Sequence, residues 1–205
     1  MVWRHGRTAW NVENRFQGHT DIALDEVGVS QAERAAALLA QLPIDRIVSS
    51  DLARAADTAR ALAALTGHEV LLDPRLRETN GGSWEGMRGP EIAAADAERY
   101  LSWRQGADVA AGGAETRSQV AQRAQASVLA HLAEVPEGGQ LVVVTHGGTA
   151  RSLLGHLLGL PVDLWRAIGA LSNACWSVAE EGRTAWWLAE HNAGSLPTPV
   201  IGDDR

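Results

Sequence analysis

Two histidines, each followed by a glycine, are the residues of this chain with the clearest chemical potential. His5 lies between Arg4 and Arg7, and His146 lies far along the chain before Gly147. Guanidinium groups match the geometry of phosphate oxygens, and two nearby cations suit a dianion. A neutral imidazole in line with phosphorus is a competent nucleophile. A lone histidine of this kind is more often an ordinary surface residue, but a second histidine turn favours a shared anion site.

Arg54 is a third candidate because of its place in a predicted helix. The helix is expected to be capped by Asp51 and to end before Gly67. A cation in a first helical turn is unfavourable, because the helix dipole is already positive there. The arrangement makes sense if an anion binds at the same end. The alternative interpretation of Arg54 is a solvated surface charge.

Four segments resemble the motifs of the histidine phosphatase superfamily, the phosphoglycerate-mutase-like proteins. They are Arg-His-Gly-x-Thr at 4–8, Ser-Ser-x-Leu-x-Arg-Ala-x-x-Thr-Ala at 49–59, Leu-Arg-Glu at 76–78 and Thr-His-Gly at 145–147. The segments occur in family order and span most of the chain, which makes the signal strong. The resemblance implies phosphoryl transfer through a phosphohistidine, with neither cofactor nor metal.

The resemblance also implies a set of site residues. The catalytic residues implied are Arg4, His5, Arg54, Glu78 and His146. The substrate-binding residues implied are Asn11, Gln17, Gly18 and Gly147. His5 would be the nucleophile, Glu78 the proton donor, and the arginines and His146 positive hydrogen-bond donors to the phosphoryl group. Asn11 and Gln17, taken singly, could equally be polar loop residues that cap and turn the chain.

Composition limits the classes of function and partner. The chain has 205 residues, 45% of them hydrophobic and 21% charged, with a net charge of −7 and a pI of about 5.5. This acidic balance argues against nucleic-acid binding and requires any positive site to be local. We expect no membrane partner, because no apolar stretch approaches the roughly 18 residues needed for a span. A signal peptide is not expected, and the single Cys175 allows no internal disulfide, so a cytoplasmic location is predicted.

Apolar periodicity predicts an α/β fold. Short apolar strands alternate with helices up to residue 159, and a hairpin around 180–183 closes the chain. This order predicts a three-layer α/β/α sandwich with a mostly parallel central sheet and an antiparallel edge, and the resemblance implies the same fold. We expect a single domain over 1–192 and a flexible tail over 193–205.

Apolar periodicity is weaker in the segments that connect the predicted strands and helices. Residues 11–21 are expected to form a loop, and residues 79–90 a Gly-rich access loop over the site. A helix is expected to open at Pro90 and to reach about Trp103. Trp84 in the access loop could stack on a sugar, although a tryptophan in the core is the commoner case. Histidine and acidic residues show no metal-ligand spacing.

Three functions remain in competition. A mutase must exclude water and return the phosphoryl group to an acceptor, and mutases of the family have a longer segment after the catalytic glutamate. The short segment here favours a phosphatase that acts on a small phosphate ester and releases inorganic phosphate. Several further stretches, among them residues 82–86 and 172–176, resemble the actinobacterial glucosyl-3-phosphoglycerate phosphatases. A non-catalytic phospho-ligand-binding protein ranks last, and the oligomeric state stays open, with a homodimer as one alternative.

Overall fold

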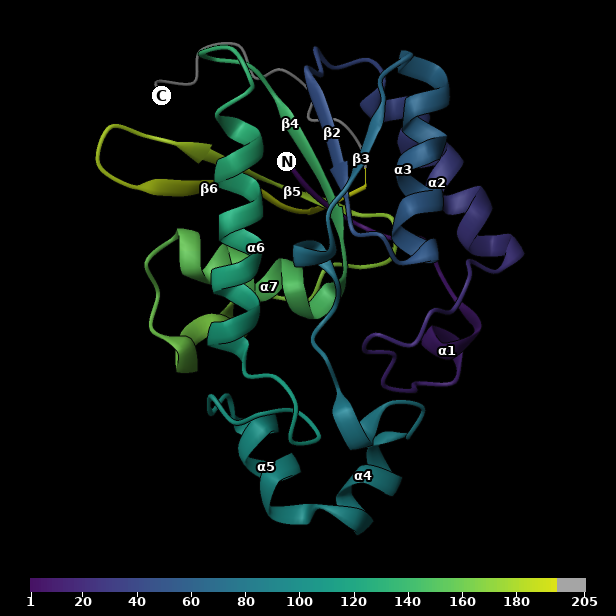
Figure 1. Ribbon diagram of the computed structural model, residues 1–205, viewed down its shortest axis with the longest axis vertical. Coiled ribbons are helices and arrows are strands. Elements are labelled where there is room, and N and C mark those ends of the chain that lie inside the picture. The colour runs from purple at the N-terminus through teal and green to yellow at the C-terminus, as the bar shows by residue number, and fades with distance from the viewer. Residues whose placement is uncertain (195–205) are drawn as a thin grey trace.

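The computed structural model describes residues 1–194, and a six-stranded sheet of order β3-β2-β4-β1-β5-β6 forms its centre (Figure 1). The first four strands of that order are parallel, whereas β5 pairs antiparallel with β1, and β6 with β5. The strands are β1 (Val2–Arg4), β2 (Arg46–Ser49), β3 (Val70–Leu72), β4 (Leu141–Thr145), β5 (Trp176–Glu181) and β6 (Trp186–Ala193). The predicted mostly parallel sheet with an antiparallel edge is confirmed, and so is the hairpin.

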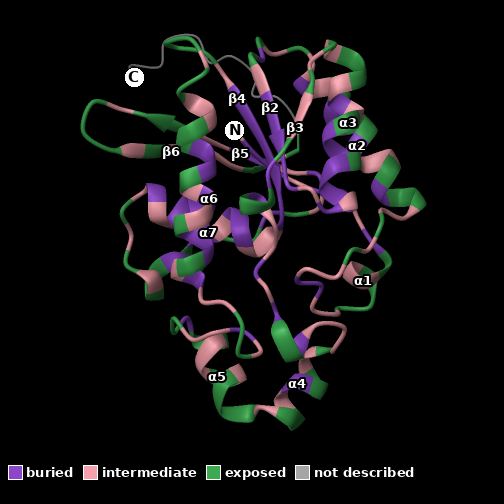
Figure 2. Cartoon of the chain, viewed as in Figure 1, coloured by how far each residue is buried: buried purple, intermediate pink, exposed green. Residues whose placement is uncertain are grey.

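Helices on both faces of the sheet make the three layers (Figure 1). The larger helices are α2 (Glu26–Leu39) and α3 (Ala53–Thr66) on one face, and α6 (Arg117–Leu132) and α7 (Gly147–Leu157) on the other. Side chains of β4 alternate between the two cores: Val142 and Val144 pack with α2 and α3, and Val143 packs with α6 and α7. Both faces of β4 are therefore covered, which is why this strand is apolar along most of its length (Figure 2).

The ends of α2 and α3 follow the capping signals of the sequence except at the start of α3. Asp25 caps α2 by accepting a hydrogen bond from the Gly28 amide (2.7 Å), and Gly67 ends α3 in the left-handed conformation. The predicted cap of α3 by Asp51 is wrong, because that carboxylate pairs with Arg77 at 2.6 Å. Asp21, from a distant loop, accepts instead from the first amide of α3 at 2.8 Å.

The region between β3 and α6 contains two short helices in place of the predicted single helix. These are α4 (Gly89–Ala95) and α5 (Ala97–Gln105), which lie together away from the sheet (Figure 1). The chain breaks at Asp96, whose φ of −147° and ψ of 58° are not helical. A second correction concerns the loop predicted over 11–21, which begins inside a short helix, α1 (Ala9–Val12). Four residues are too few for a helical period to be visible in the sequence.

A small third core holds this outlying region together. Trp84, Ile92 and Ala111 are buried in it, and side chains from two loops and α5 pack around them. We call this group the aromatic cap; its residues are Phe16, Trp84, Met87, Ile92, Tyr100, Trp103 and Ala111. The aromatic cap lies beyond the carboxyl ends of the parallel strands (Figure 1).

The C-terminal strand and the described helices complete the fold. β6 reaches Ala193, one residue beyond the predicted domain boundary at 192, and the rest of the predicted tail from 195 to 205 lies outside the described residues. Within residues 1–194, no helix combines the length and apolarity that crossing a bilayer requires.

Candidate active site

Parallel pairing of β1 with β4 brings the two histidines together. Arg4 lies opposite Thr145 in the strand register, so the residues that follow, His5 and His146, leave the sheet side by side. Their ring centroids are 5.1 Å apart, and both side chains are buried. Two turns separated by most of the chain thus form one cluster. We call Arg4, His5, Arg54 and His146 the histidine–arginine cluster.

The ring of His5 is held as a neutral imidazole with one free nitrogen. Its Nδ1 lies 2.6 Å from the Gly6 carbonyl oxygen, which can only accept, so Nδ1 carries the hydrogen. Burial lowers the pKa of His5 well below its ordinary value, and the charges of Arg4 and Arg54 lower it further. Nε2 therefore keeps its lone pair at neutral pH, which is the requirement for attack on phosphorus.

His146 is also neutral, which differs from the positive donor expected from the sequence. Burial lowers the pKa of its imidazole, and the adjacent Arg54 is the next cause. Nδ1 of His146 accepts a hydrogen bond from Nε of Arg54 (3.1 Å), and Nε2 lies 2.8 Å from the Ser50 hydroxyl. Both nitrogens are thus engaged within the protein, and the positive charge of the cluster resides on its arginines.

Arg54 is completely buried and fixed at every nitrogen of its side chain. Besides the bond to His146, Nη1 donates to the Thr20 carbonyl and Nη2 to the Gly18 carbonyl, both at 2.9 Å. The residue belongs to the first turn of α3, which follows β2, the other neighbour of β4. Arg54 has five N–H groups, so it retains hydrogens for a further acceptor after these three bonds.

Arg4 contains a buried donor with no acceptor among the described residues. Its Nη1 donates to the Leu171 carbonyl at 2.5 Å, whereas the buried Nε has no hydrogen-bond partner. An unsatisfied buried donor costs free energy, and an anion bound beside it would supply the missing acceptor. Gly147 lies against this guanidinium, where a Cβ atom would be 3.4 Å from Nε and from Cζ.

Glu78 lies at the N-terminus of α7, the helix that starts directly after His146. Its carboxylate accepts hydrogen bonds from the amides of Gly148 and Thr149, both at 3.0 Å, and from the Thr79 amide at 2.8 Å. The position predicted from the Leu-Arg-Glu motif is thus adjacent in space to the predicted Thr-His-Gly motif. The two motifs meet because α7 and the segment after β3 share the same end of the sheet.

The predicted substrate-binding residues have separate structural tasks. Oδ1 of Asn11 accepts from the Thr8 amide (3.1 Å) at the cap of α1, and Oε1 of Gln17 accepts from the Thr8 hydroxyl (3.1 Å). Gly18 supplies the carbonyl that holds Arg54. Asn11 borders a cavity next to the cluster, whereas no contact of Gln17 or Gly18 with that cavity is seen.

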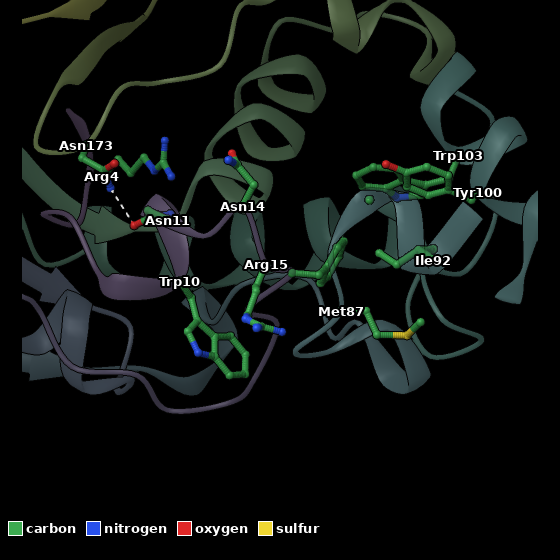
Figure 3. A pocket seen from close by; sticks show the side chains of 12 residues that line it. Arg4, Trp10, Asn11, Asn14, Arg15, Met87, Ile92, Tyr100, Trp103 and Asn173 are labelled. Carbon is green, nitrogen blue, oxygen red and sulfur yellow. Dashed lines mark hydrogen bonds between the residues drawn. The ribbon is translucent and has the colours of Figure 1, made fainter. Parts of the chain in front are cut away.

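Asn173 is a residue of this region that the sequence did not single out. Its side-chain amide donates to the His5 carbonyl (3.1 Å) and to Oδ1 of Asn11 (3.2 Å), as the dashed line in Figure 3 marks for the second bond. It precedes Ala174, whose φ of 57° is unusual for a residue with a Cβ atom. In the sequence, segment 172–176 is a point of resemblance without an assigned role, and a loop asparagine carries no chemical signal by itself.

A cavity of about 440 Å³ extends from Arg4 to the aromatic cap, and Arg4 is the member of the histidine–arginine cluster that lines it. Figure 3 shows Arg4, Asn11 and Asn173 on one side and Tyr100, Trp103, Ile92 and Met87 on the other. Arg15 and Asn14 lie between the two sides. The cavity therefore joins a cationic end with a wall of apolar and aromatic side chains.

The hypothesis that Trp84 presents its face to a sugar is wrong. The side chain is 1% exposed and packs edge-on against Phe16, Tyr100 and Trp103, with centroid distances of 5.7–6.0 Å. Its ring fills the core of the cap, which is the commoner fate of a tryptophan. The aromatic residues that border the cavity are Trp10, Phe16, Tyr100 and Trp103.

Comparison with known proteins gives one family and a consistent set of relatives. The profile of the Histidine phosphatase superfamily (branch 1) matches residues 1–194. Glucosyl-3-phosphoglycerate phosphatase of Mycolicibacterium vanbaalenii is 42% identical over 182 residues, which cover 86% of this chain and 81% of that relative. A probable phosphoglycerate mutase of Erwinia tasmaniensis is 34% identical over 196 residues, covering 91% of this chain and 88% of that protein.

Solved structures resemble the whole described fold. Mycobacterial glucosyl-3-phosphoglycerate phosphatase in complex with VO3 matches with a TM-score of 0.88 and 40% identity, over 94% of this chain and 97% of that one. The complex of the same mycobacterial phosphatase with inorganic phosphate matches with a TM-score of 0.85 and 40% identity, over 94% and 95% of the two chains. Those relatives thus bind a phosphate-like oxyanion on the same fold.

Proposed function

The chain belongs to branch 1 of the histidine phosphatase superfamily, and from that premise we propose that it hydrolyses a small phosphate monoester through a phosphohistidine on His5. The observation that carries the proposal is the state of His5 itself. Its Nδ1 is committed to the Gly6 carbonyl, its Nε2 has no hydrogen-bond partner within residues 1–194, and its pKa is lowered by burial beside Arg4 and Arg54. A neutral nucleophile next to two guanidiniums meets the needs of in-line attack on a phosphoryl group.

The first half-reaction exchanges one bond to phosphorus for another. Nε2 of His5 forms a bond to phosphorus while the bond to the ester oxygen breaks. Arg4 and Arg54 hold the phosphoryl oxygens, and the unpaired Nε of Arg4 gains its acceptor. Glu78, protonated at this stage, gives its proton to the leaving alcohol.

Water completes the second half-reaction. The Glu78 carboxylate takes a proton from water, the resulting hydroxide attacks phosphorus, and the bond between His5 and phosphorus breaks to release inorganic phosphate. This restores the protonated carboxyl and the neutral imidazole, so no net proton is lost by the protein. The amides of Gly148 and Thr149 keep the carboxyl oriented through both steps.

Two other carboxylates of the access loops are poor candidates for the proton donor. Glu115 lies 2.6 Å from Arg123, and this hydrogen-bonded ion pair lowers its pKa against the effect of burial. Glu85 accepts four hydrogen bonds, which also lower its pKa although burial alone would raise it. Glu115 and Glu85 are thus committed to Arg123 and to the amides of the access loops, whereas Glu78 lies at the start of α7, directly after His146, which supports Glu78 as the proposed donor.

The cavity supports an ester whose alcohol carries a sugar. About 440 Å³ is ample for a glycosylated three-carbon acid, and the aromatic wall at Tyr100 and Trp103 suits the apolar face of a sugar ring. Asn14, Arg15 and Asn173 supply polar groups for hydroxyls or a carboxylate. We therefore propose glucosyl-3-phosphoglycerate as the substrate, in agreement with the names of the similar mycobacterial phosphatases.

A phosphate-release assay over a panel of esters tests this function. The panel holds sugar phosphates, phosphoglycerates and glucosyl-3-phosphoglycerate, and we expect the highest kcat/KM for the last. Conversion of one phosphoglycerate isomer into the other without phosphate release would identify a mutase instead. Tight binding without turnover of any ester would identify a phospho-ligand-binding protein.

A further inference from the structure

Glu85 links the access loop to the segment that holds Arg54. Oε1 of its carboxylate accepts from the amides of His19 (2.8 Å) and Gly81 (3.0 Å). Oε2 accepts from the amide and the hydroxyl of Thr20, at 3.0 and 2.7 Å. Both oxygens are therefore paired twice, and three of the four donors belong to residues 19–20. We call residues 17–21 the strap.

The same strap supplies the acceptors of the Arg54 guanidinium, through the carbonyls of Gly18 and Thr20. The Gly18 carbonyl and the His19 amide belong to one peptide group. Because a trans peptide is planar, its C=O and N–H point in opposite directions, and fixing one fixes the other. This peptide is held between a carboxylate on its N–H and a guanidinium on its C=O, so the position of Glu85 determines that of the acceptor for Arg54.

Glycines make room for this link on both sides. Gly18 has a φ of 52°, which disfavours other residues, and a Cβ atom there would overlap the Glu85 carboxylate. A Cβ atom on Gly81 would collide with the Phe16 ring, 2.5 Å from its nearest atom, and would meet Cγ of Glu85 at 3.0 Å. The Gln-Gly segment at 17–18 and the Gly-rich access loop are separate loops in the sequence. In the structure their glycines make room for the same contact, the one with the Glu85 carboxylate.

Charge strengthens the link. Burial alone would raise the pKa of Glu85, but the hydrogen bonds from His19, Thr20 and Gly81 outweigh it and lower the pKa. The carboxylate is therefore ionised at neutral pH. Burial lowers the pKa of Arg54, and the negative charges of Asp21 and Glu85 oppose that lowering. Arg54 is thus supported both in position and in charge.

We propose that Glu85 is a positioning residue for the phosphatase reaction, which holds the strap so that Arg54 presents its free N–H groups to the phosphoryl oxygens. This proposal rests on the proposed role of Arg54 as an anion donor. Glu85 itself touches no reacting atom in this account. Because it belongs to the access loop, it makes the geometry of the anion site depend on the placement of that loop.

A double-mutant cycle between Glu85 and Arg54 tests the proposal. We measure the inhibition constant of inorganic phosphate and kcat for a nitrophenyl ester in Glu85→Gln, Arg54→Ala and the double variant. Glu85→Gln keeps the shape but turns an amide NH₂ toward donors of the strap, so we expect phosphate inhibition to weaken about tenfold and kcat to fall in parallel. In the Arg54→Ala background, Glu85→Gln should change the inhibition constant and kcat by less than about twofold, because the guanidinium that Glu85 positions is absent.

Controls keep the outcomes separate. Glu98→Gln, on the exposed surface of α5, should change neither quantity. Thr20→Val removes only the hydroxyl donor at 2.7 Å and should weaken phosphate inhibition about threefold, which retains a readout if Glu85→Gln folds poorly. Thermal unfolding of each variant shows whether it is folded at the assay temperature.

The two proposals fail in different ways. If Arg54→Ala leaves phosphate inhibition unchanged, the proposed role of Arg54 is wrong, and with it the function ascribed to Glu85. If Arg54→Ala weakens inhibition while folded Glu85→Gln and Thr20→Val do not, only the positioning proposal is overturned. Losses that multiply in the double variant would also overturn it, because Glu85 would then act independently of Arg54.

Discussion

Arg4 of the histidine–arginine cluster and the aromatic cap border one cavity, but the cluster and the cap are built in opposite ways. The side chains of His5, Arg54 and His146 are polar, almost fully buried and placed by the ends of β1, β2 and β4. The cap consists of aromatic and aliphatic side chains from loops and short helices, and α5 has no buried residue at all. Burial in a rigid sheet suits groups that must be held in a reactive state, whereas the peripheral cap is connected to them through the access loop that carries Glu85.

The cap depends on a few contacts at its edges. Arg117 donates to the carbonyls of Trp103 and Ala107, both at 2.7 Å, and its guanidinium lies 4.6 Å from the Trp103 ring centre. These bonds tie the C-terminal end of α5 to the start of α6. The comparison therefore assigns the chemical step to the sheet and the choice of alcohol to the cap. Variants on the two sides should separate these tasks.

The largest effect is expected for the nucleophile. His5→Ala should reduce kcat by about 10³-fold or more for alkyl and nitrophenyl phosphates alike, because no phosphoenzyme can form. Steady-state phosphate release on both esters measures this. A variant that keeps most of its activity on either ester would remove His5 from the role of nucleophile.

Arg54→Ala should have the next largest effect, on the order of 10²-fold in kcat, because a donor to the transition state is lost. Competitive inhibition by phosphate or vanadate should weaken as well. Both quantities come from one set of rate measurements at several inhibitor concentrations. Full inhibition together with reduced turnover would show that Arg54 lies outside the anion site.

Glu78→Gln should separate substrates by their leaving group. An alkoxide needs a proton and a nitrophenolate does not, so phosphoenzyme formation should fall about 10²-fold more for an alkyl ester. The burst of nitrophenolate should survive, and the later hydrolysis should slow. Burst kinetics and single-turnover rates measure the two steps. Equal slowing of phosphoenzyme formation for both esters would reduce Glu78 to a binding or structural role.

Trp103→Ala tests the cap side of the comparison. Loss of the stacked ring should raise KM about fivefold for a glucosylated ester, consistent with about 1 kcal/mol for an aromatic contact, and should leave a small ester unchanged. Trp187→Ala, a half-exposed tryptophan on β6, is the matched control. If kcat falls equally for large and small esters, the cap is part of the chemical machinery and the division of tasks is wrong.

The smallest expected effect is a pH dependence of the free energy of unfolding, which arises from the buried histidines at the strand ends. Burial lowers the pKa of His5 and His146, so the folded state leaves them neutral while the unfolded chain binds protons below about pH 6.5. Stability should therefore fall as the pH falls through that value, by up to about 1.4 kcal/mol per pH unit for each histidine. Urea unfolding between about pH 8 and 5 should show a shallower loss for His5→Asn. An unchanged slope would contradict the buried neutral state.

The difference between the sheet and the aromatic cap also explains which features could be predicted from the sequence. Strands such as β4 are apolar on both faces and α2 has a helical stripe and a cap, so periodicity located the layers and the strand ends. The cap offered no such pattern: the break at Asp96 and the burial of Trp84 depend on contacts between loops. The lowered pKa of His146 is equally invisible in the sequence, because it results from burial beside Arg54 and no local sequence shows that neighbour.

The most direct test of the account is the identity of the residue that carries phosphate during turnover. The enzyme is quenched in alkali within the burst on a labelled nitrophenyl ester, and the labelled peptide is mapped. We predict phosphate on His5, in a bond that is stable to alkali and labile to acid, and none in His5→Ala. Label on a serine, or on His146, would contradict the account.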